Sequence, residues 1–527
     1  MSAMETPFPR RTMLAGAATL GGAVLLAACG SKGTGSGGAA ASASPQAGGT
    51  AQLVQSADIA VKSILGQNLP NFTLQRLVWN TLTEYDISTL EPKPSLATEW
   101  SWSTDRLALT VALRDDVKFH SGRPFGPQDV IDAIQRQAAP PTGLNPGQLK
   151  AAAAAVSGVE ATGDHEVTIH LANPVSNFFD LFEAMYILDT ESIDDLIAGT
   201  AFVGTGPFTF GSRTPNVSLA LEKNPDYWKS GRPYLDGVEM RVIAQPDAML
   251  SALRSRQAQL AANLPGTTLE SLQGNDDFNV TAMKTQDAGW YVGCNVTVSP
   301  LDDKRVRQAI AYSIDREKVL TDSLGGIGTS TSIPWSPTSP AFDEDAAGTY
   351  SLDIDRAKSL LAEAGASDAE LHLAVNAGQS VTGSIAEGIQ FSIEQTGLTV
   401  IIDPLQDADF VARLVGGQMP GLWVASHGFG QMSPATLLTG AFPFNAAKNA
   451  SNFSDPAYTD LSQQVFTAGS EEDAQAAYGE VTDFLLDQQF VVDMVSSSYS
   501  YTTTSSFQGY GYTLLDFLNL DDAFLES

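Results

Sequence analysis

Histidine and serine residues in fixed patterns would be the first signs of metal binding or hydrolysis in this chain. The sequence has five histidines, of which only two are close together: His120, His165, His170, His372 and His427. His165 and His170 stand near the ends of a predicted strand, where their odd separation places them on opposite faces. No Gly-x-Ser-x-Gly elbow and no His-Glu-x-x-His motif occurs. We therefore predict no catalytic residue, no metal ligand and no cofactor, although composition alone leaves open a carboxylate-pair glycosidase.

The beginning of the chain holds a cysteine whose surroundings indicate covalent modification. Arg10 and Arg11 precede an apolar run that ends in Leu26-Ala27-Ala28, directly before Cys29. A charged start, a short apolar middle and small residues before a cleavage point are typical of an export signal. The run is shorter than the ~20 residues of a membrane-spanning helix. Leu-Ala-Ala-Cys resembles the lipobox of bacterial lipoproteins, in which the thiol is acylated and becomes the new N-terminus.

We therefore predict a signal peptide at 1–28 and lipidation of Cys29. An ordinary signal peptide with an incidental cysteine is the alternative. Arg10 and Arg11 suggest export in the folded state through a twin-arginine route, and an ordinary basic segment is the alternative there.

Residues 29–50 are predicted to be a lipid-anchored flexible tether. They are mostly Gly, Ser, Ala and Thr, which supply little that could form a core. A flexible coil of about 20 residues reaches ~25 Å. Its Gly-x-Gly-x-x-Gly match at 33–38 has no strand before it and no helix after it, so we read it as linker.

Charge and length limit the classes of partner and fold. The formal net charge is −31, which repels nucleic acid and anionic lipid headgroups. The chain has two cysteines, Cys29 and Cys294. Because Cys29 is predicted to be acylated, Cys294 has no partner for an internal disulfide in the exported chain. The remaining stretch of about 480 residues exceeds a single core, and we expect at least two lobes.

Strands and helices alternate along the chain. Residues 107–113 and 166–171 read as half-buried strands. Helices are predicted to begin near Pro127, Asp303, Asp355 and Glu471, each with an acidic residue in its first turn. Helix-to-strand units at 355–375 and 381–402 favour an α/β lobe with a largely parallel sheet.

A series of sequence blocks, in order, resembles the family 5 solute-binding proteins, the extracellular peptide-, nickel- and opine-binding components of ABC importers. The blocks cover nearly the whole exported chain: Leu96-Ala97-Thr98-Glu99-Trp100, Leu113-Arg114-Asp115-Asp116-Val117-Lys118-Phe119-His120-Ser121-Gly122, Gln128-Asp129-Val130, Gly204-Thr205-Gly206-Pro207-Phe208, Asn224-Pro225-Asp226-Tyr227-Trp228, Arg232-Pro233-Tyr234-Leu235-Asp236-Gly237-Val238, Asp303-Lys304-Arg305-Val306-Arg307-Gln308-Ala309-Ile310, Ser313-Ile314-Asp315-Arg316 and Ala357-Lys358-Ser359-Leu360-Leu361. Each block alone is weak, and their shared order and spacing are specific.

The resemblance implies an α/β fold, a two-lobed clamp of the type 2 periplasmic-binding-protein class with an additional α+β subdomain. The first lobe would take 51–90, 198–288 and 498–527, the subdomain 91–197 and the second lobe 289–497. The implied function is to capture a peptide or peptide-like solute between the lobes and deliver it to an ABC permease and its ATPase. The protein would be a monomer, not an enzyme, held on the outer side of the cell membrane by lipid on Cys29. A receptor that only signals, without uptake, and a lipid-anchored hydrolase are the alternatives.

The ligand-binding segment departs from the pattern of peptide binders in this family. In those relatives a Trp is followed three positions later by an Asp that accepts the peptide ammonium group. Trp423 is present here, but Ser426 occupies the Asp position and supplies no countercharge.

We weigh two hypotheses for the pocket. In the first, it takes a neutral or anionic solute, such as a modified peptide, a sugar or an opine, lined by Trp423, Ser426, His427, Phe429 and Gln431. In the second, peptides remain the ligand and an acid elsewhere holds the ammonium group. Trp79 and Asn80 are further candidates by the family match. Chelated nickel through His427 is a lesser alternative, and internal packing of His427 and Phe429 in a loop is the non-functional one.

Overall fold

The computed structural model describes residues 45–272, 274–428 and 432–526 of the chain. The predicted signal peptide with Arg10 and Arg11, the lipidated Cys29, and the pocket candidates Phe429 and Gln431 lie outside these residues. The stretch from Pro45 to Ser527 forms one compact unit. None of the helices within the described stretches is both long and apolar enough to cross a membrane.

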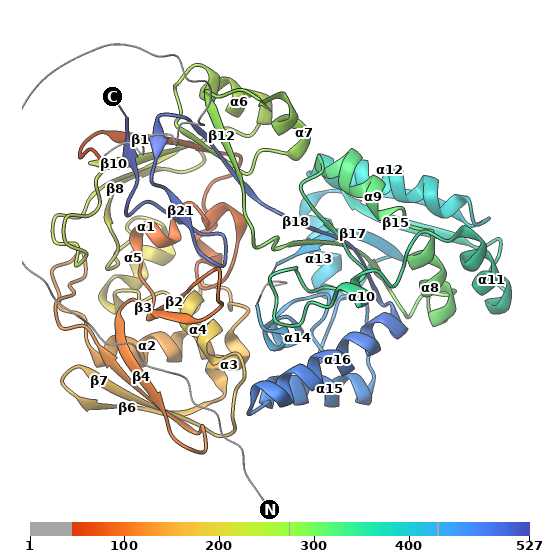
Figure 1. The fold of residues 1–527 in the computed structure, drawn as a ribbon, viewed down its shortest axis with the longest axis horizontal. Helices are drawn as coiled ribbons and strands as arrows, with labels where there is room; N and C mark the ends of the chain where they lie inside the picture. The colour runs from red at the N-terminus through yellow and green to blue at the C-terminus, as the bar shows by residue number, and fades with distance from the viewer. Residues whose placement is uncertain (1–44, 273, 429–431, 527) are drawn as a thin grey trace, which may run out of the picture. The chain divides into compact units, whose positions relative to one another are not determined.

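A seven-stranded sheet collects strands from the beginning, the middle and the end of the described chain (Figure 1). β1 lies inside the sheet and runs parallel to its neighbours β10 and β11, whereas the other pairs are antiparallel. In sheet order the strands are β12 (Phe278–Ala282), β19 (Ser500–Thr504), β11 (Leu260–Ala262), β1 (Thr50–Gln55), β10 (Gly237–Val242), β9 (Ser218–Lys223) and β8 (Phe208–Thr214).

The second sheet has six strands and a mixed order of directions. β15 runs parallel to β16 and β17, and the remaining pairs are antiparallel. The prediction of a largely parallel sheet is therefore wrong. The chain enters this sheet through β13, which follows β12 of the first sheet, and leaves it through β18, which precedes β19 of the first sheet. The neighbouring strands β13 and β18 therefore run in opposite directions. In sheet order the strands are β14 (Gly328–Ser330), β18 (Val491–Ser497), β13 (Ala288–Cys294), β17 (Leu422–His427), β15 (Glu370–Asn376) and β16 (Thr399–Leu405).

A third sheet of four antiparallel strands stands apart from both. It contains β4 (Ala97–Trp102), β5 (Ala108–Leu113), β7 (Glu166–Leu171) and β6 (Val156–Gly163), in that order. Buried and half-buried residues alternate along β5 and β7, as expected of strands with one face on a core. The two strands predicted at 107–113 and 166–171 are confirmed. Short two-stranded ladders complete the β-structure: β2 (Thr83–Tyr85) with β3 (Pro92–Pro94), β20 (Phe507–Gln508) with β23 (Phe524–Leu525), and β21 (Gly511–Tyr512) with β22 (Leu518–Asn519).

The main helices begin at side chains that cap them. Asp303, Asp353 and Ser470 each accept a hydrogen bond from a backbone N–H of the following first turn. Gly365 ends one helix with φ of 71°, a left-handed conformation that suits glycine. The four predicted helix starts are confirmed to within a residue. The longer helices are α2 (Pro127–Ala138), α4 (Phe178–Ala184), α5 (Ile193–Ala198), α6 (Pro246–Arg254), α8 (Lys304–Ser313), α11 (Ile354–Ala364), α12 (Ser380–Glu394), α13 (Asp407–Gly416), α14 (Pro434–Gly440), α15 (Pro456–Thr467) and α16 (Glu471–Gln488).

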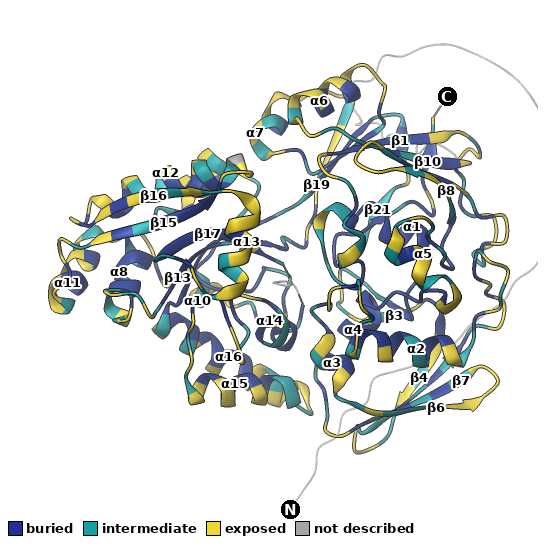
Figure 2. Cartoon of the chain, turned by 180° about the vertical axis from the view of Figure 1, so that it is seen from behind, coloured by how far each residue is buried: buried dark blue, intermediate teal, exposed yellow. Residues whose placement is uncertain are grey.

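Short helices of three to five residues fill the connections. They are α1 (Gln75–Val78), α3 (Lys150–Ala154), α7 (Gly266–Leu269), α9 (Arg316–Lys318) and α10 (Glu344–Ala347), four 3₁₀ turns (Val61–Ser63, Leu69–Asn71, Thr190–Ser192 and Glu270–Leu272) and one π turn (Val319–Ser323). Figure 2 shows the strands of the second sheet mostly buried, with exposed residues on the outer sides of α11, α12 and α15.

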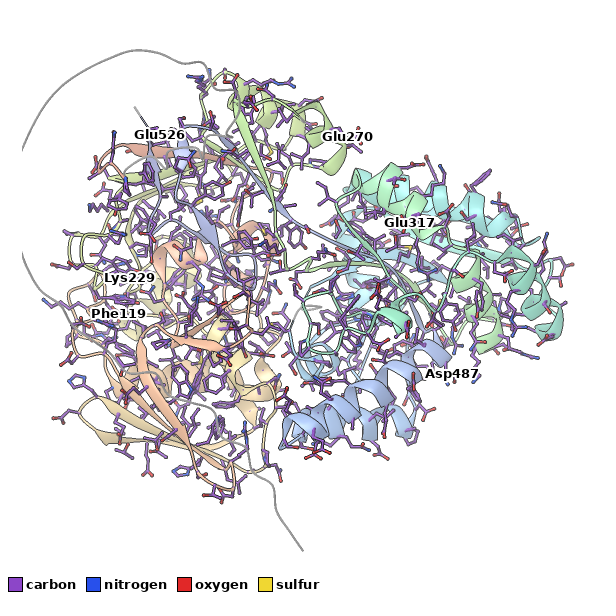
Figure 3. All side chains as sticks on the ribbon, in the orientation of Figure 1. Phe119, Lys229, Glu270, Glu317, Asp487 and Glu526 are labelled. Atoms are coloured by element: carbon purple, nitrogen blue, oxygen red, sulfur yellow. The ribbon has the colours of Figure 1, made fainter. Side chains whose placement is uncertain are left out.

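The C-terminal segment packs back on the first sheet. The Nζ of Lys229, labelled in Figure 3, lies 2.6 Å from Oδ2 of Asp521. Tyr227 also donates its hydroxyl to the Asp521 carboxylate, at 3.3 Å. Tyr227 of the Asn224-to-Trp228 block and the adjacent Lys229 thus hold the end of the chain, which is a structural rather than a ligand-binding role.

Candidate ligand-binding site

β17 lies in the middle of the six-stranded sheet and ends at the candidate pocket segment. It pairs with β13, so that Ser426 stands opposite Trp290 and His427 opposite Gly289. Ser426 is exposed near the end of the strand, whereas the other residues of β17 are buried. A Cβ at Gly289 would lie 2.5 Å from Nε2 of His427. Glycine at 289 therefore leaves the room in which the imidazole packs.

A cavity of about 590 Å³ opens at the end of β17. One wall comes from the segment around α3, far away in sequence, and the other from β17 and the chain before and after α14. The lining residues are 146–148, Lys150, Ala151, Ala154, Tyr291, Leu414, 426–428, 439–443, Asn445 and Lys448. The two walls touch where Gly440 meets Gln148, since a Cβ on Gly440 would lie 2.3 Å from the Gln148 carbonyl oxygen.

Two of the predicted pocket residues, Ser426 and His427, line this cavity, and the predicted Trp423 does not. Trp423 is fully buried. Its ring covers Gly293, where an added Cβ would lie 2.1 Å from ring carbons. The indole packs inside the sheet and does not line this cavity, so the structure corrects its expected place on the cavity wall to one of packing.

Trp79 and Asn80 are also placed in the interior. Trp79 is fully buried and its Nε1 donates to the Val203 carbonyl at 2.9 Å. The Asn80 Oδ1 accepts from Thr205 Oγ1 and from Trp228 Nε1, both at 3.1 Å. Protein partners therefore occupy the polar atoms that a ligand would need, and the expectation that these residues face the ligand is corrected as well.

His427 forms part of the wall but has its own buried surroundings. Its ring packs against Tyr291 at 5.8 Å and Phe444 at 5.2 Å between centroids. Nε2 lies 3.8 Å from Oδ1 of Asp493 on β18. Burial raises the pKa of Asp493, and His427 and Arg316 oppose that rise. The imidazole thus stands between the cavity and a buried carboxylate.

Arg316, the last residue of the Ser313-to-Arg316 block, is the buried cation behind this wall. Its guanidinium donates to four backbone carbonyls, those of Ala311, Thr331, Tyr350 and Asp493, at distances from 2.7 to 3.1 Å. Burial lowers its pKa to about 10, so it remains charged at neutral pH. The Ser313-to-Arg316 block predicts the family resemblance but not these hydrogen bonds of Arg316.

A second carboxylate lies near the cavity, behind Gly428. Asp287 is 1% exposed, and its Oδ2 accepts a hydrogen bond from Gln67 Nε2 at 2.5 Å. Burial, and then the negative charge of Asp287, raise the pKa of the neighbouring Asp516. Asp287, beside Gly428, is therefore the candidate for the hypothesis that an acid elsewhere holds a peptide ammonium group.

A larger surface groove of about 950 Å³ runs along the edge strand β12 and the β21 turn. Its lining includes Lys284, Thr338 and residues 278–281 and 508–512, but none of the predicted pocket residues. We take the cavity at β17 as the candidate site, because its lining includes Ser426 and His427.

Buried polar contacts join α4 to α14 beside the cavity. Thr436 donates its hydroxyl to Asp180 Oδ2 at 2.6 Å, and Asn177 Nδ2 donates to the Thr436 oxygen at 2.8 Å. Tyr85 donates to the other Asp180 oxygen at 2.8 Å. Ser433, which precedes Pro434, accepts from the Ala435 N–H and so caps α14. These contacts fix α14, and with it one wall of the cavity, against the α4 side.

The titration of Asp180 gives this contact a pH dependence. Burial raises its pKa to about 6, against a value of 3.8 when exposed, and the hydrogen bonds from Thr436 and Tyr85 only partly offset this. Between pH 3.8 and about 6, Asp180 is therefore protonated in the folded state and ionised in the unfolded state. Protonated Asp180 therefore stabilises the folded state fully below about pH 4. This contribution to the free energy of unfolding, about 3 kcal/mol in all, is lost as the pH rises through 6.

We expect the free energy of unfolding of the wild type, minus that of Asp180→Asn, to fall between about pH 4 and pH 6 and to stay level above pH 7. Urea denaturation of both proteins across that range measures the difference. Parallel stability curves would show that Asp180 titrates at an ordinary pKa.

The chain is similar to known proteins over most of its length. The profile of "Bacterial extracellular solute-binding proteins, family 5 Middle" matches residues 91–448. Di/tripeptide-binding protein 2 of Pseudomonas aeruginosa (strain UCBPP-PA14) is 26% identical over 447 residues, which cover 78% of this chain and 82% of that protein.

Two solved structures have similar folds. The periplasmic binding protein DppA from Helicobacter pylori in complex with the peptide STSA has a TM-score of 0.79 at 22% identity, over 92% of this chain and 99% of its own. AgaA from A. tumefacien R10 in complex with agropinic acid has a TM-score of 0.79 at 21% identity, over 91% and 99%.

Proposed function

This chain belongs to the bacterial extracellular solute-binding proteins of family 5, and from this we propose that it captures a small peptide or peptide-like solute in the cavity at the end of β17. The solute is then handed to the permease of an ABC importer, whose ATPase drives uptake. Members of the family are extracytoplasmic binding proteins and not enzymes, so no bond is made or broken in this step.

The cavity with two walls is the observation that carries the proposal. Ser426 and His427 lie on one wall, and Gln148 and Lys150 lie on the other, from a segment more than 270 residues earlier. A solute that contacts both walls stabilises the arrangement in which they are close, and a permease can then sense that arrangement. A pocket within one lobe would give no such signal.

The place of the protein in the cell is part of the proposal. We propose that the signal at 1–28 directs export, that lipid on Cys29 anchors the chain to the outer side of the membrane, and that 29–50 act as a tether. The compact unit from Pro45 onward would then work as a monomer beside its permease.

A thermal-shift screen of residues 45–527 tests the binding function. The panel holds di- to pentapeptides, N-blocked peptides, sugars, opines and chelated nickel. A solute that binds only the folded protein stabilises it by about 2.7 kcal/mol at a hundred times its dissociation constant. We expect at least one class to raise the melting temperature in a concentration-dependent way. A flat response to every class at millimolar concentration would contradict the proposal.

A further inference from the structure

The charges that line the cavity at β17 differ from those of the chain as a whole. The chain carries 60 acidic and 29 basic residues. Among its described residues, however, the cavity lining has two lysines, Lys150 and Lys448, and neither aspartate nor glutamate. Lys150 begins α3 on one wall and Lys448 follows α14 on the other. A very acidic protein thus presents positive charge from both sides of one cavity.

Both lysines are available to a solute. Each is exposed, and neither makes an ion pair with any carboxylate in the described part of the chain. When a solute fills the cavity, it displaces water from the ammonium groups, and a cation that loses water needs an anion in exchange. Since the described lining supplies no anion, the solute has to bring one.

A free ammonium group on the solute would meet the opposite situation. The uncharged polar groups of the lining are largely engaged: Thr439 donates to the Ala435 carbonyl, and Gln148 bonds to the backbone of Gln67. The exposed Ser426 offers a hydroxyl without charge. Asp493 lies behind His427 and Asp287 behind Gly428, both nearly inaccessible. An ammonium group in the cavity would therefore lack a countercharge and be repelled by both lysines.

We infer that the solute carries a carboxylate, which binds between Lys150 and Lys448, and that it has no free ammonium group. N-acylated peptides and dicarboxylic or other amine-free organic acids share this chemistry, whereas ordinary peptides do not. The inference rests on the proposed function, because it assigns the class of solute taken by the same cavity.

Isothermal titration calorimetry of residues 45–527 with four matched probes tests this preference for a carboxylate without an ammonium group. These are a dipeptide, the same dipeptide N-acetylated, the N-acetylated dipeptide amidated at its C-terminus, and a dicarboxylic acid of similar length. We expect the N-acetylated acid, the dicarboxylic acid or both to bind at least tenfold more tightly than the free dipeptide and the doubly blocked one. Which of the two acids binds distinguishes a peptide-derived source from an organic acid.

Lysine variants assign the effect to the cavity. Lys150→Met with Lys448→Met is expected to weaken binding of the acid at least tenfold and to flatten its dependence on salt. Lys358→Met on α11, which removes an exposed lysine away from the cavity, should bind as the wild type does. Equal melting temperatures of the unliganded variants exclude a loss of folding.

The outcomes separate this inference from the function on which it rests. Tight binding of the free dipeptide, with no effect of the lysine variants, would overturn the inference and leave solute binding intact. Loss of that binding in Asp287→Asn would identify Asp287 as the acid that holds the ammonium group. The absence of binding by every solute class in the thermal-shift screen would instead remove the function itself.

Discussion

Replacing Arg316 by methionine is expected to lower the free energy of unfolding by about 3–5 kcal/mol. The guanidinium is buried and donates to the carbonyls of Ala311, Thr331, Tyr350 and Asp493. Methionine fills part of the volume but donates no hydrogen bond, so these carbonyls lose a partner and the Asp493 carboxylate loses the favourable charge of Arg316. The urea midpoint, followed by tryptophan fluorescence, measures the loss.

Arg305→Met is the matched control for this change. Arg305 lies on the same stretch of chain, but its side chain is 44% exposed and pairs with Asp303 at the surface. Exposed ion pairs contribute little, so its urea midpoint should stay close to that of the wild type. Equal effects of the two substitutions would mean that the buried hydrogen bonds of Arg316 do not stabilise the fold.

The substitution Ser426→Trp is expected to weaken solute binding by roughly 100-fold, or about 2.7 kcal/mol, without loss of stability. Ser426 is exposed at the end of β17 and its side chain borders the cavity. An indole at this position occupies space that the solute needs, and it disturbs no buried contact. Isothermal titration with a solute found in the thermal-shift screen measures the affinity.

Ser367→Trp controls for the bulk and apolar character of the indole. Ser367 is exposed in the connection between α11 and β15, and it does not border the cavity. We expect unchanged affinity for this variant. If Ser426→Trp also bound as the wild type does, the solute would have to bind somewhere else.

Local signals were sufficient for the helix starts and the two strands predicted from the sequence. Helix starts at Asp303 and near Asp355, and the stop at Gly365, follow from hydrogen bonds or backbone angles that involve a few neighbouring residues. The two-lobed fold of mixed α/β content, expected from the order of the sequence blocks, is confirmed by the similar solved structures. The parallel character of the second sheet was misjudged, because strand direction depends on where β13 and β18 connect to the first sheet.

The site was predicted only on one wall. Ser426 and His427 stand next to each other in the block that drew attention to them, whereas Gln148 and Lys150 come from a Pro- and Gly-rich stretch with no family signal. Trp79 and Trp423, by contrast, were predicted to face the ligand and instead lie in the core. Large aromatic residues bind ligands and fill cores equally well, and only the surrounding glycines and carbonyls of the fold show which of the two occurs.

The most direct test of the proposed solute site is a crystal structure of residues 45–527 with the tightest-binding solute of the thermal-shift screen. We expect solute density in the cavity between Gln148 and Lys150 on one wall and Ser426 and His427 on the other. Density in the groove along β12 and β21, with the β17 cavity empty, would contradict it.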